Sequence, residues 1–214
     1  MTKILLPLHK LINQCEGQFS TLAESRKPIL KQLAEFIQEK QKLNESIDLN
    51  FICTHNSRRS HIAQVWAQTA AAYYRIEKVR CFSGGTEATA FNPRAVKAMT
   101  EVGFIITKLD NSENPRYDIR FSETEMPLIA FSKKYDDASN PTQGFAAIMT
   151  CSHADENCPL VVGAAARISL PYDDPKDFDG TDQEGEKYHE RVLEIGLEIA
   201  FAFSLVQVSD NLLL

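Results

Sequence analysis

Hydrophobic and polar positions follow one pattern in the first 47 residues of the 214-residue chain and another in the rest. The apolar positions of the early part recur at helical spacing: Ile29, Leu30, Leu33, Phe36 and Ile37. Ser25 is a candidate helix cap, and Pro28 suits a first helical turn. Residues 1–47 are therefore predicted to form a helical extension whose apolar face packs on another surface.

From residue 47 onward, short apolar runs of strand length alternate with longer helical patterns. Strands are predicted at IDLNFICT, KVRCFSGG, MPLIAFS and FAAIMTC, with ARISLPY as a fifth strand or a strand end. Helices are predicted from about residue 59 to 76, 92 to 99 and 182 to 207. Strands that alternate with helices indicate an α/β fold, in which a parallel sheet is covered by helices on both faces.

Composition narrows the class of protein. The chain is 43% hydrophobic and 24% charged, which suits one globular domain with room for an appendage. Its net charge of −6 argues against a general nucleic-acid surface, because phosphate backbones attract excess positive charge. The apolar run LEIGLEIAFAFSLVQV is interrupted by Glu194 and Glu198 and is too short for a membrane span. With no signal peptide evident, we expect a cytoplasmic protein whose thiols are mostly reduced.

The stretch CTHNSRRS places a thiol and two guanidinium groups in one turn between a predicted strand and a predicted helix. Backbone N–H groups in such a turn, at the positive end of a helix, form a cradle for an anion. Arg59 can add a bidentate clamp for a tetrahedral oxyanion, and the same field favours a thiolate at Cys53. The alternative is a buried cysteine beside two solvated arginines.

Other reactive side chains also follow predicted strands. Ser83, Cys151 and the pair Asp173–Asp174 do so, and the carboxyl ends of parallel strands meet at one edge of a sheet. A carboxylic acid at this edge would supply a proton to a leaving oxygen. Asp174 stands directly before Pro175, with Asp173 as the second choice. A simple polar turn is the alternative interpretation.

Cys151 and Cys158 lie seven residues apart. In a regular helix this offset corresponds to about 10 Å of rise, beyond the ~7 Å that a disulfide spans between Cα atoms. Oxidation would require the polar segment between them to loop out, which indicates a conformational redox switch. Two unrelated thiols and a zinc site are the alternatives, although no second cysteine or histidine pair accompanies them. Cys15 and Cys81 are interpreted as small apolar core residues.

The stretch CTHNSRRS, together with FSGGTEATAFNPRAVKAMTEVGF, FAAIMTCSHADENCP and LPYDDP, resembles the low-molecular-weight protein tyrosine phosphatases and the thioredoxin-coupled arsenate reductases. The resemblance covers roughly residues 48–207. It implies a four-stranded parallel sheet with helices on both faces, in a catalytic domain of residues 48–214 that follows the extension of residues 1–47.

The resemblance also implies roles for individual residues. Cys53 matches the nucleophile, Arg59 the anion clamp and Asp174 the acid, while Asn56 and Ser60 match the polar residues that hold the loop and the thiolate. The oxyanion would be bound by His55, Asn56, Ser57, Arg58, Arg59 and Ser60.

Four residues depart from the family pattern. His55 stands where the family usually has glycine, so a positive φ is expected at this position. Arg58 replaces a cysteine that many members have, and its charge either supports the Cys53 thiolate or points to solvent. Lys176 and Asp177 stand where the phosphatases carry a tyrosine pair, which weakens the phosphatase interpretation.

The cysteine pair decides between reactions that the loop accepts equally, because arsenate and phosphate have the same charge and nearly the same shape. In the family reductases Cys53, Cys151 and Cys158 would act in sequence, and thioredoxin would reduce the final disulfide. We therefore expect a thioredoxin-coupled arsenate reductase that needs no metal or cofactor. The alternatives are a low-molecular-weight phosphatase acting on phosphomonoesters and a non-catalytic oxyanion-binding module.

Overall fold

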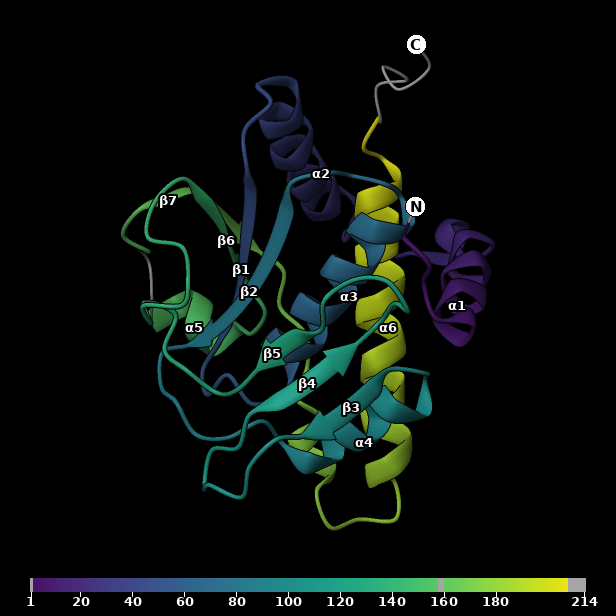
Figure 1. Ribbon diagram of the computed structural model, residues 1–214, viewed down its shortest axis with the longest axis vertical. Coiled ribbons are helices and arrows are strands. Elements are labelled where there is room, and N and C mark those ends of the chain that lie inside the picture. The colour runs from purple at the N-terminus through teal and green to yellow at the C-terminus, as the bar shows by residue number, and fades with distance from the viewer. Residues whose placement is uncertain (1, 158–159, 208–214) are drawn as a thin grey trace.

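The central sheet has four parallel strands in the order β2-β1-β6-β7 in the computed structural model, which describes residues 2–157 and 160–207 (Figure 1). Its strands are β1 (Ile47–Cys53), β2 (Val79–Gly85), β6 (Phe145–Met149) and β7 (Ala164–Ser169). β1 and β6 are buried along their whole length, as expected for strands in the middle of a parallel sheet. The predicted α/β class and the four-stranded parallel sheet are confirmed.

The register of this sheet brings the carboxyl ends of its strands to one edge. Cys53, the last residue of β1, pairs with Gly85, the last residue of β2. On the other side of β1, Ile52 pairs with Met149 of β6, which in turn pairs with Ser169 of β7. The segments that follow these strands therefore lie close together at the carboxyl edge of the sheet.

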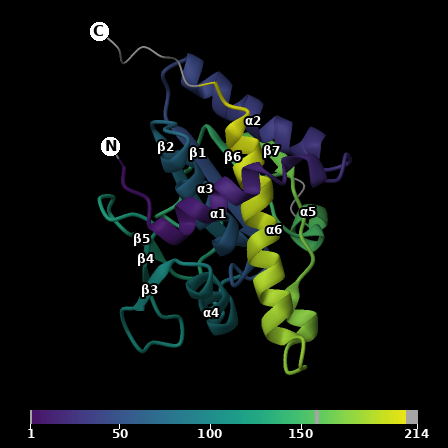
Figure 2. The same ribbon diagram turned by 90° about the vertical axis from the view of Figure 1, so that its right-hand side faces the viewer.

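Helices and 3-10 turns surround the sheet. They are α1 (Leu6–Glu16), η1 (Phe19–Thr21), α2 (Lys27–Lys42), α3 (Arg59–Tyr73), α4 (Pro93–Glu101), α5 (Ser152–Asn157), η2 (Pro175–Phe178) and α6 (Glu184–Ser204). Successive residues of β1 point to opposite faces, so Leu49 and Phe51 join the large core that α2, α3 and α6 also line, whereas Ile52 joins a smaller cluster with α5. Figure 2 shows α6 running along the first of these faces.

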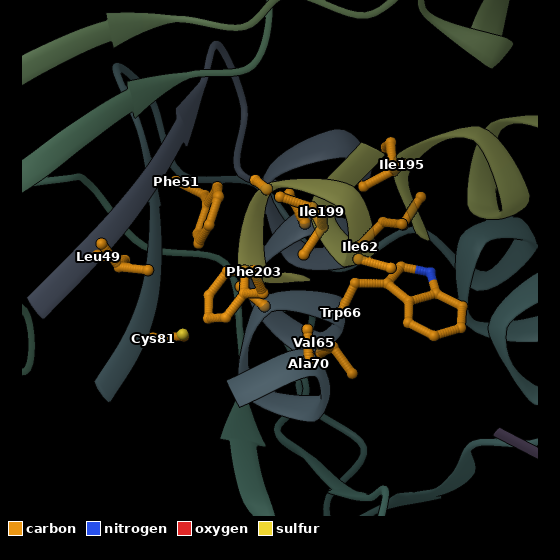
Figure 3. Close-up of a cluster of buried hydrophobic side chains, with 14 of the residues drawn as sticks. Leu49, Phe51, Ile62, Val65, Trp66, Ala70, Cys81, Ile195, Ile199 and Phe203 are labelled. Carbon is orange, nitrogen blue, oxygen red and sulfur yellow. The ribbon is translucent and has the colours of Figure 1, made fainter. Parts of the chain in front are cut away.

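Trp66 on α3 is central to the large core (Figure 3). Its indole N–H donates to the carbonyl of Val192 on α6 at 2.9 Å. A Cβ atom at Gly196 would come within 2.7 Å of the indole, so this glycine permits the close contact of α3 and α6. Phe203 and Ile199 of α6 belong to the same core and lie beside Phe51 (Figure 3).

A second sheet lies beside the first and is antiparallel. It contains β3 (Ile105–Lys108), β4 (Tyr117–Arg120) and β5 (Leu128–Ala130) in that order. The predicted strand MPLIAFS corresponds to β5, so its placement in the parallel sheet was wrong. β5 is only three residues long and pairs with β4, which the sequence pattern did not predict.

The N-terminal 47 residues contain α1, η1 and α2. The predicted apolar face of α2 is confirmed, because Leu30, Leu33, Phe36 and Ile37 are buried and Ile29 is partly buried against the same core. Pro28 lies in its first turn as predicted, but the cap position is Arg26 and no side chain caps the helix, so the expectation for Ser25 was wrong. The division into an extension of residues 1–47 and a domain of residues 48–214 stays a prediction. No helix in the described part of the chain is long and apolar enough to cross a membrane.

Candidate active site

The turn after β1 directs its carbonyl groups outward. The carbonyls of Cys53 and Thr54 accept hydrogen bonds from the N–H groups of Thr86 and Glu87, at 3.1 and 2.8 Å. The Ser57 carbonyl likewise accepts a hydrogen bond from the N–H group of Asn92, at 2.9 Å. Within residues 2–157 and 160–207, the N–H groups of residues 55–58 donate to no protein acceptor. Loop 53–60 therefore keeps its backbone donors available for an anion.

Asn56 holds the shape of loop 53–60. Its φ is +45°, and its side chain donates to Ser60 Oγ at 2.9 Å while accepting from the Lys133 N–H at 2.9 Å. The positive φ expected at His55 was therefore placed one residue too early. Asparagine adopts this left-handed conformation more readily than most residues, and the two hydrogen bonds of its side chain stabilise it here.

Cys53 lies under this loop and is almost fully buried. Its Sγ is 3.1 Å from Ser60 Oγ. Because Ser60 Oγ already accepts a hydrogen bond from Asn56, its own proton is free to point at the sulfur. Such a donor stabilises the negative charge of a thiolate at Cys53.

Gly85 allows β2 to approach the loop closely. A Cβ atom at this position would lie 2.6 Å from the Thr54 carbonyl oxygen and 2.7 Å from the Asn56 nitrogen. Any side chain would push residues 54–56 away from their positions. Gly85 therefore supports the loop by leaving space for it.

Arg59 contacts the segment that follows β7. Its Nη1 donates to the Tyr172 carbonyl at 2.8 Å, and its Nη2 donates to Asp174 Oδ2 at 2.5 Å. Among the described residues its Nε is buried without a hydrogen-bond partner, so this N–H group is available to an oxyanion. Asp174 also accepts from the N–H of Lys176 at 3.1 Å, so it caps η2.

The two candidate acids are placed differently. A small pocket at the edge of the sheet is lined by Cys53, His55, Ser57, Arg58, Arg59 and Asp174. The side chain of Asp173 is 98% exposed and pairs at 3.8 Å with Arg191, away from these residues. Of the two, Asp174 has the geometry that the predicted acid requires. Ser83 lies within β2 and is buried, with its hydroxyl 3.1 Å from His61 Nδ1, so it does not line this pocket.

Arg58 does not point to solvent. Its Nε donates to the Tyr188 hydroxyl at 2.7 Å and its Nη2 to Asp179 Oδ2 at 3.3 Å, both outside loop 53–60. Burial, with a smaller contribution from the Asp179 carboxylate, raises the pKa of Tyr188 to about 12. Arg58 thus adds positive charge to the pocket wall, and the carboxylates of Asp179 and Asp174, at 3.3 and 4.0 Å, partly neutralise it.

Cys151 directly follows β6 and is buried beside loop 53–60. Its Sγ lies 3.4 Å from Thr54 Oγ1 and accepts a hydrogen bond from the Ala154 N–H at 3.4 Å. Thr54 Oγ1 is also 3.2 Å from His153 Nδ1. Cys151 and Cys53 belong to one small apolar cluster. The partner predicted for Cys151, Cys158, lies outside the described residues.

The remaining cysteines lie in the core, as predicted. Cys15 and Cys81 are buried and free, like Cys53 and Cys151. Burial raises the pKa of Cys15 to about 11 and that of Cys81 well above its usual range. Neither thiol has the environment of a nucleophile. In the described part of the chain, no group of three or more His, Cys, Asp or Glu side chains is arranged to hold a metal ion.

Three contacts of the site were not anticipated. The contact of Thr54 with Cys151 was not predicted. The contact of Thr54 with His153 was not predicted either, because His153 was interpreted only as part of a polar segment. The carbonyl of Tyr172 is a backbone group, and nothing in the sequence identifies it as the acceptor for Arg59. All three depend on packing between segments about 100 residues apart. Only the position of Thr54 next to Cys53 offered a signal.

The chain is thus an α/β protein with a cysteine-centred loop between β1 and α3 whose backbone N–H groups are available for an anion. No family model matches the chain. An arsenate reductase of Halalkalibacterium halodurans is 31% identical over 150 residues, which cover 70% of this chain and 89% of that protein. An arsenate reductase of Bacillus cereus is 33% identical over 125 residues, covering 58% and 74% of the two chains. The chain therefore belongs to the family of thioredoxin-coupled arsenate reductases and low-molecular-weight protein tyrosine phosphatases.

Solved structures resemble the chain more distantly. A low-molecular-weight phosphotyrosine phosphatase from Vibrio cholerae has a TM-score of 0.48 and 15% identity, covering 74% of this chain and 95% of that one. An arsenate reductase in a phosphate-binding state has a TM-score of 0.45 and 18% identity, covering 75% and 99%.

Proposed function

We propose that this protein is an arsenate reductase in which Cys53 is the nucleophile and Cys151 and Cys158 are the resolving pair. The observation that supports this most directly is the contact of Cys151 with Thr54, the residue next to Cys53. A hydrolase of this fold needs no second thiol at that position. A reductase needs one within reach of the nucleophile, because two electrons must come from sulfur.

In the first step arsenate binds to the N–H groups of residues 55–58 and to Arg59. The Cys53 thiolate attacks arsenic, an S–As bond forms, and one As–O bond breaks. Asp174 donates the proton with which that oxygen leaves as water. Arsenic remains arsenic(V) in this step, so no electrons have yet been transferred.

Electrons move in the second step. The Cys151 thiolate attacks Cys53 Sγ, an S–S bond forms, and the S–As bond breaks. The electron pair of the broken bond stays on arsenic, which becomes arsenic(III) and leaves as arsenite. The two sulfurs are oxidised to a Cys53–Cys151 disulfide.

The third step regenerates Cys53. The Cys158 thiolate attacks Cys151 Sγ, and Cys53 leaves as a thiolate. The resulting Cys151–Cys158 disulfide is reduced by an external dithiol protein, for which thioredoxin is the proposed partner. The proposed step requires the segment between Cys151 and Cys158, which includes α5, to loop out, because a regular helix over this seven-residue offset would rise about 10 Å, beyond the ~7 Å that a disulfide spans between Cα atoms.

Arsenite formation with thioredoxin, thioredoxin reductase and NADPH tests this proposal. Cys53→Ser, Cys151→Ser and Cys158→Ser should each abolish turnover, and Cys81→Ser, at a buried thiol away from the site, should not. Turnover that survives Cys151→Ser would rule out the proposed electron path.

Hydrolysis of phosphomonoesters is the second candidate function, supported by the presence of Asp174 beside Arg59 in the pocket. Under this alternative, phosphate release from an aryl phosphate persists in Cys151→Ser and Cys158→Ser and is lost in Cys53→Ser. Binding of phosphate with neither activity would instead identify a non-catalytic module.

A further inference from the structure

Arg26 connects the N-terminal part of the chain to the segment that carries Asp174. Its Nε and Nη2 donate to the two carboxylate oxygens of Glu198 on α6, both at 2.7 Å. Its third guanidinium nitrogen, Nη1, donates to the Pro171 carbonyl at 3.1 Å. The Glu198 side chain is only 4% exposed and that of Arg26 is 21% exposed, so this bidentate pair fixes the plane of the guanidinium in a partly buried position.

Segment 170–174 is thereby held by two arginines. Arg26 binds the Pro171 carbonyl, and its Cζ lies 5.1 Å from the centroid of the Tyr172 ring. Arg59 binds the carbonyl of the next residue, Tyr172, at 2.8 Å. The Tyr172 N–H donates to the Thr150 carbonyl at 3.2 Å, and its side chain is buried.

Asp174 follows two residues after this anchor. The residue between them, Asp173, has a side chain that is almost fully exposed. The position of the Asp174 carboxylate therefore depends on the anchor at Pro171 and Tyr172 and on its own contacts with Arg59 and Lys176. A shift of the anchor would move both the carboxylate and the guanidinium of Arg59.

We propose that Arg26 is a positioning residue for the reaction at Cys53. It fixes segment 170–174 so that Asp174 and Arg59 meet the oxyanion in the required geometry. This inference rests on the proposed function, because it assigns Arg26 to the reaction of those residues. The inference gives this part of the N-terminal residues a positioning role in the reaction, in addition to covering the central sheet.

A purely structural role for Arg26 is the alternative, in which the pair with Glu198 only joins α2 to α6. Buried ion pairs often add little net stability, but removing one partner is destabilising because the other charge stays buried. Two variants separate these roles. Arg26→Lys keeps the positive charge but cannot bind Glu198 and Pro171 with one planar fork. Arg26→Met combined with Glu198→Met removes both charges and leaves neither of them unpaired.

The matched control is Lys27→Gln. Lys27 is the neighbouring residue at the start of α2, and its Nζ pairs with Glu24, whose side chain is 85% exposed. This variant removes a positive charge at nearly the same place without changing any contact to segment 170–174.

Hydrogen exchange of residues 170–178, followed by mass spectrometry, gives a readout that does not require turnover. At a temperature where all variants are folded, the N–H groups of Tyr172 and Lys176 should exchange about tenfold faster in Arg26→Lys and in the double variant than in Lys27→Gln. In the arsenate assay, kcat/KM for arsenate should be about tenfold lower in Arg26→Lys and in the double variant than in Lys27→Gln, and the KM for thioredoxin should be unchanged.

The outcomes distinguish failure of this inference from failure of the proposed function. If residues 170–178 exchange equally in all variants, Arg26 does not hold the segment and the inference is wrong. The inference is also wrong if exchange rises but kcat/KM for arsenate equals that of Lys27→Gln. If the unmodified protein reduces no arsenate, the proposed function fails. The inference then survives only if Arg26→Lys and the double variant release phosphate from an aryl phosphate about tenfold more slowly than Lys27→Gln.

Discussion

The hydroxyl of Thr54 lies within hydrogen-bonding reach of both the Cys151 thiol and the His153 imidazole, at 3.4 and 3.2 Å. These three side chains come from the loop after β1 and from the start of α5. A proton that leaves Cys151 therefore has a path through the hydroxyl to the exposed imidazole.

Replacing this hydroxyl should slow the step that depends on the Cys151 thiolate. We expect Thr54→Val to lower kcat for arsenate reduction about tenfold or more, because valine has the shape of threonine but cannot pass a proton. Thr54→Ser keeps the hydroxyl and serves as the control. Coupled NADPH oxidation measures both rates, and equal rates would exclude a role for the hydroxyl.

Asp174→Asn should remove the proton donor while keeping the size of the side chain. Loss of a general acid typically costs roughly 10²–10⁴-fold, so we expect kcat for arsenite formation to fall by about that factor. Asp173→Asn is the matched control, because the Asp173 side chain is 98% exposed, and its rate should stay within about twofold of the unmodified protein. A larger effect of Asp173→Asn than of Asp174→Asn would reverse the assignment of the acid.

Gly85→Ala should displace loop 53–60. The added Cβ would lie 2.3 Å from the Glu87 carbonyl oxygen and 2.6 Å from that of Thr54. We expect a loss of about 1–3 kcal/mol in the free energy of unfolding, as for other overpacked sites, and loss of phosphate binding. Gly185→Ala is the control, because no atom lies within 4 Å of its added Cβ and alanine favours a helix. Phosphate binding by calorimetry and urea unfolding test both variants.

His61 should make the protein less stable in mild acid. It is fully buried against Phe91, with ring centroids 4.2 Å apart, and burial, with the nearby charge of Lys133 as a smaller cause, lowers its pKa from 6.5 to about 3. Between these two values the unfolded chain binds more protons than the folded protein. The free energy of unfolding therefore decreases as the pH falls below 6.5, and it keeps decreasing until about pH 3.

A variant at this position isolates the effect of the imidazole. Between pH 7 and pH 5, the unmodified protein should lose about 2 kcal/mol more stability than His61→Gln. Urea unfolding at the two pH values measures the difference, and carboxylates contribute little above pH 5. Parallel pH dependence in both proteins would show that His61 takes up a proton in the folded state.

The sequence alone was sufficient to predict those features of the fold and the site that depend on local residue patterns. Local sequence patterns predicted the helices α2, α3, α4 and α6 and the strands β1, β2 and β6, and they gave β7 as a strand or a strand end. Loop 53–60 was singled out because a cysteine followed by Arg59 and Ser60, between a strand and a helix, is a pattern typical of oxyanion binding. β3 and β4 were missed, since each is only four residues long and partly exposed, too short for the spacing of its apolar residues to be decisive.

Other features depend on where distant segments meet. Arg26 and Tyr172 are unremarkable in the sequence, yet the Arg26 guanidinium lies 5.1 Å from the centroid of the Tyr172 ring and binds the Pro171 carbonyl. The sequence preferred Asp174, which directly precedes Pro175, over Asp173, but only the structure shows that the Asp174 carboxylate contacts Arg59 while Asp173 is exposed.

The contact of Trp66 with Gly196 has a practical consequence for all of these experiments. Trp66 is the single tryptophan of the chain, and it is 1% exposed. Its fluorescence should be blue-shifted in the native protein and move to longer wavelength when α3 separates from α6. Emission from one indole thus reports the folded population of every variant, without a label and far from the sulfur chemistry.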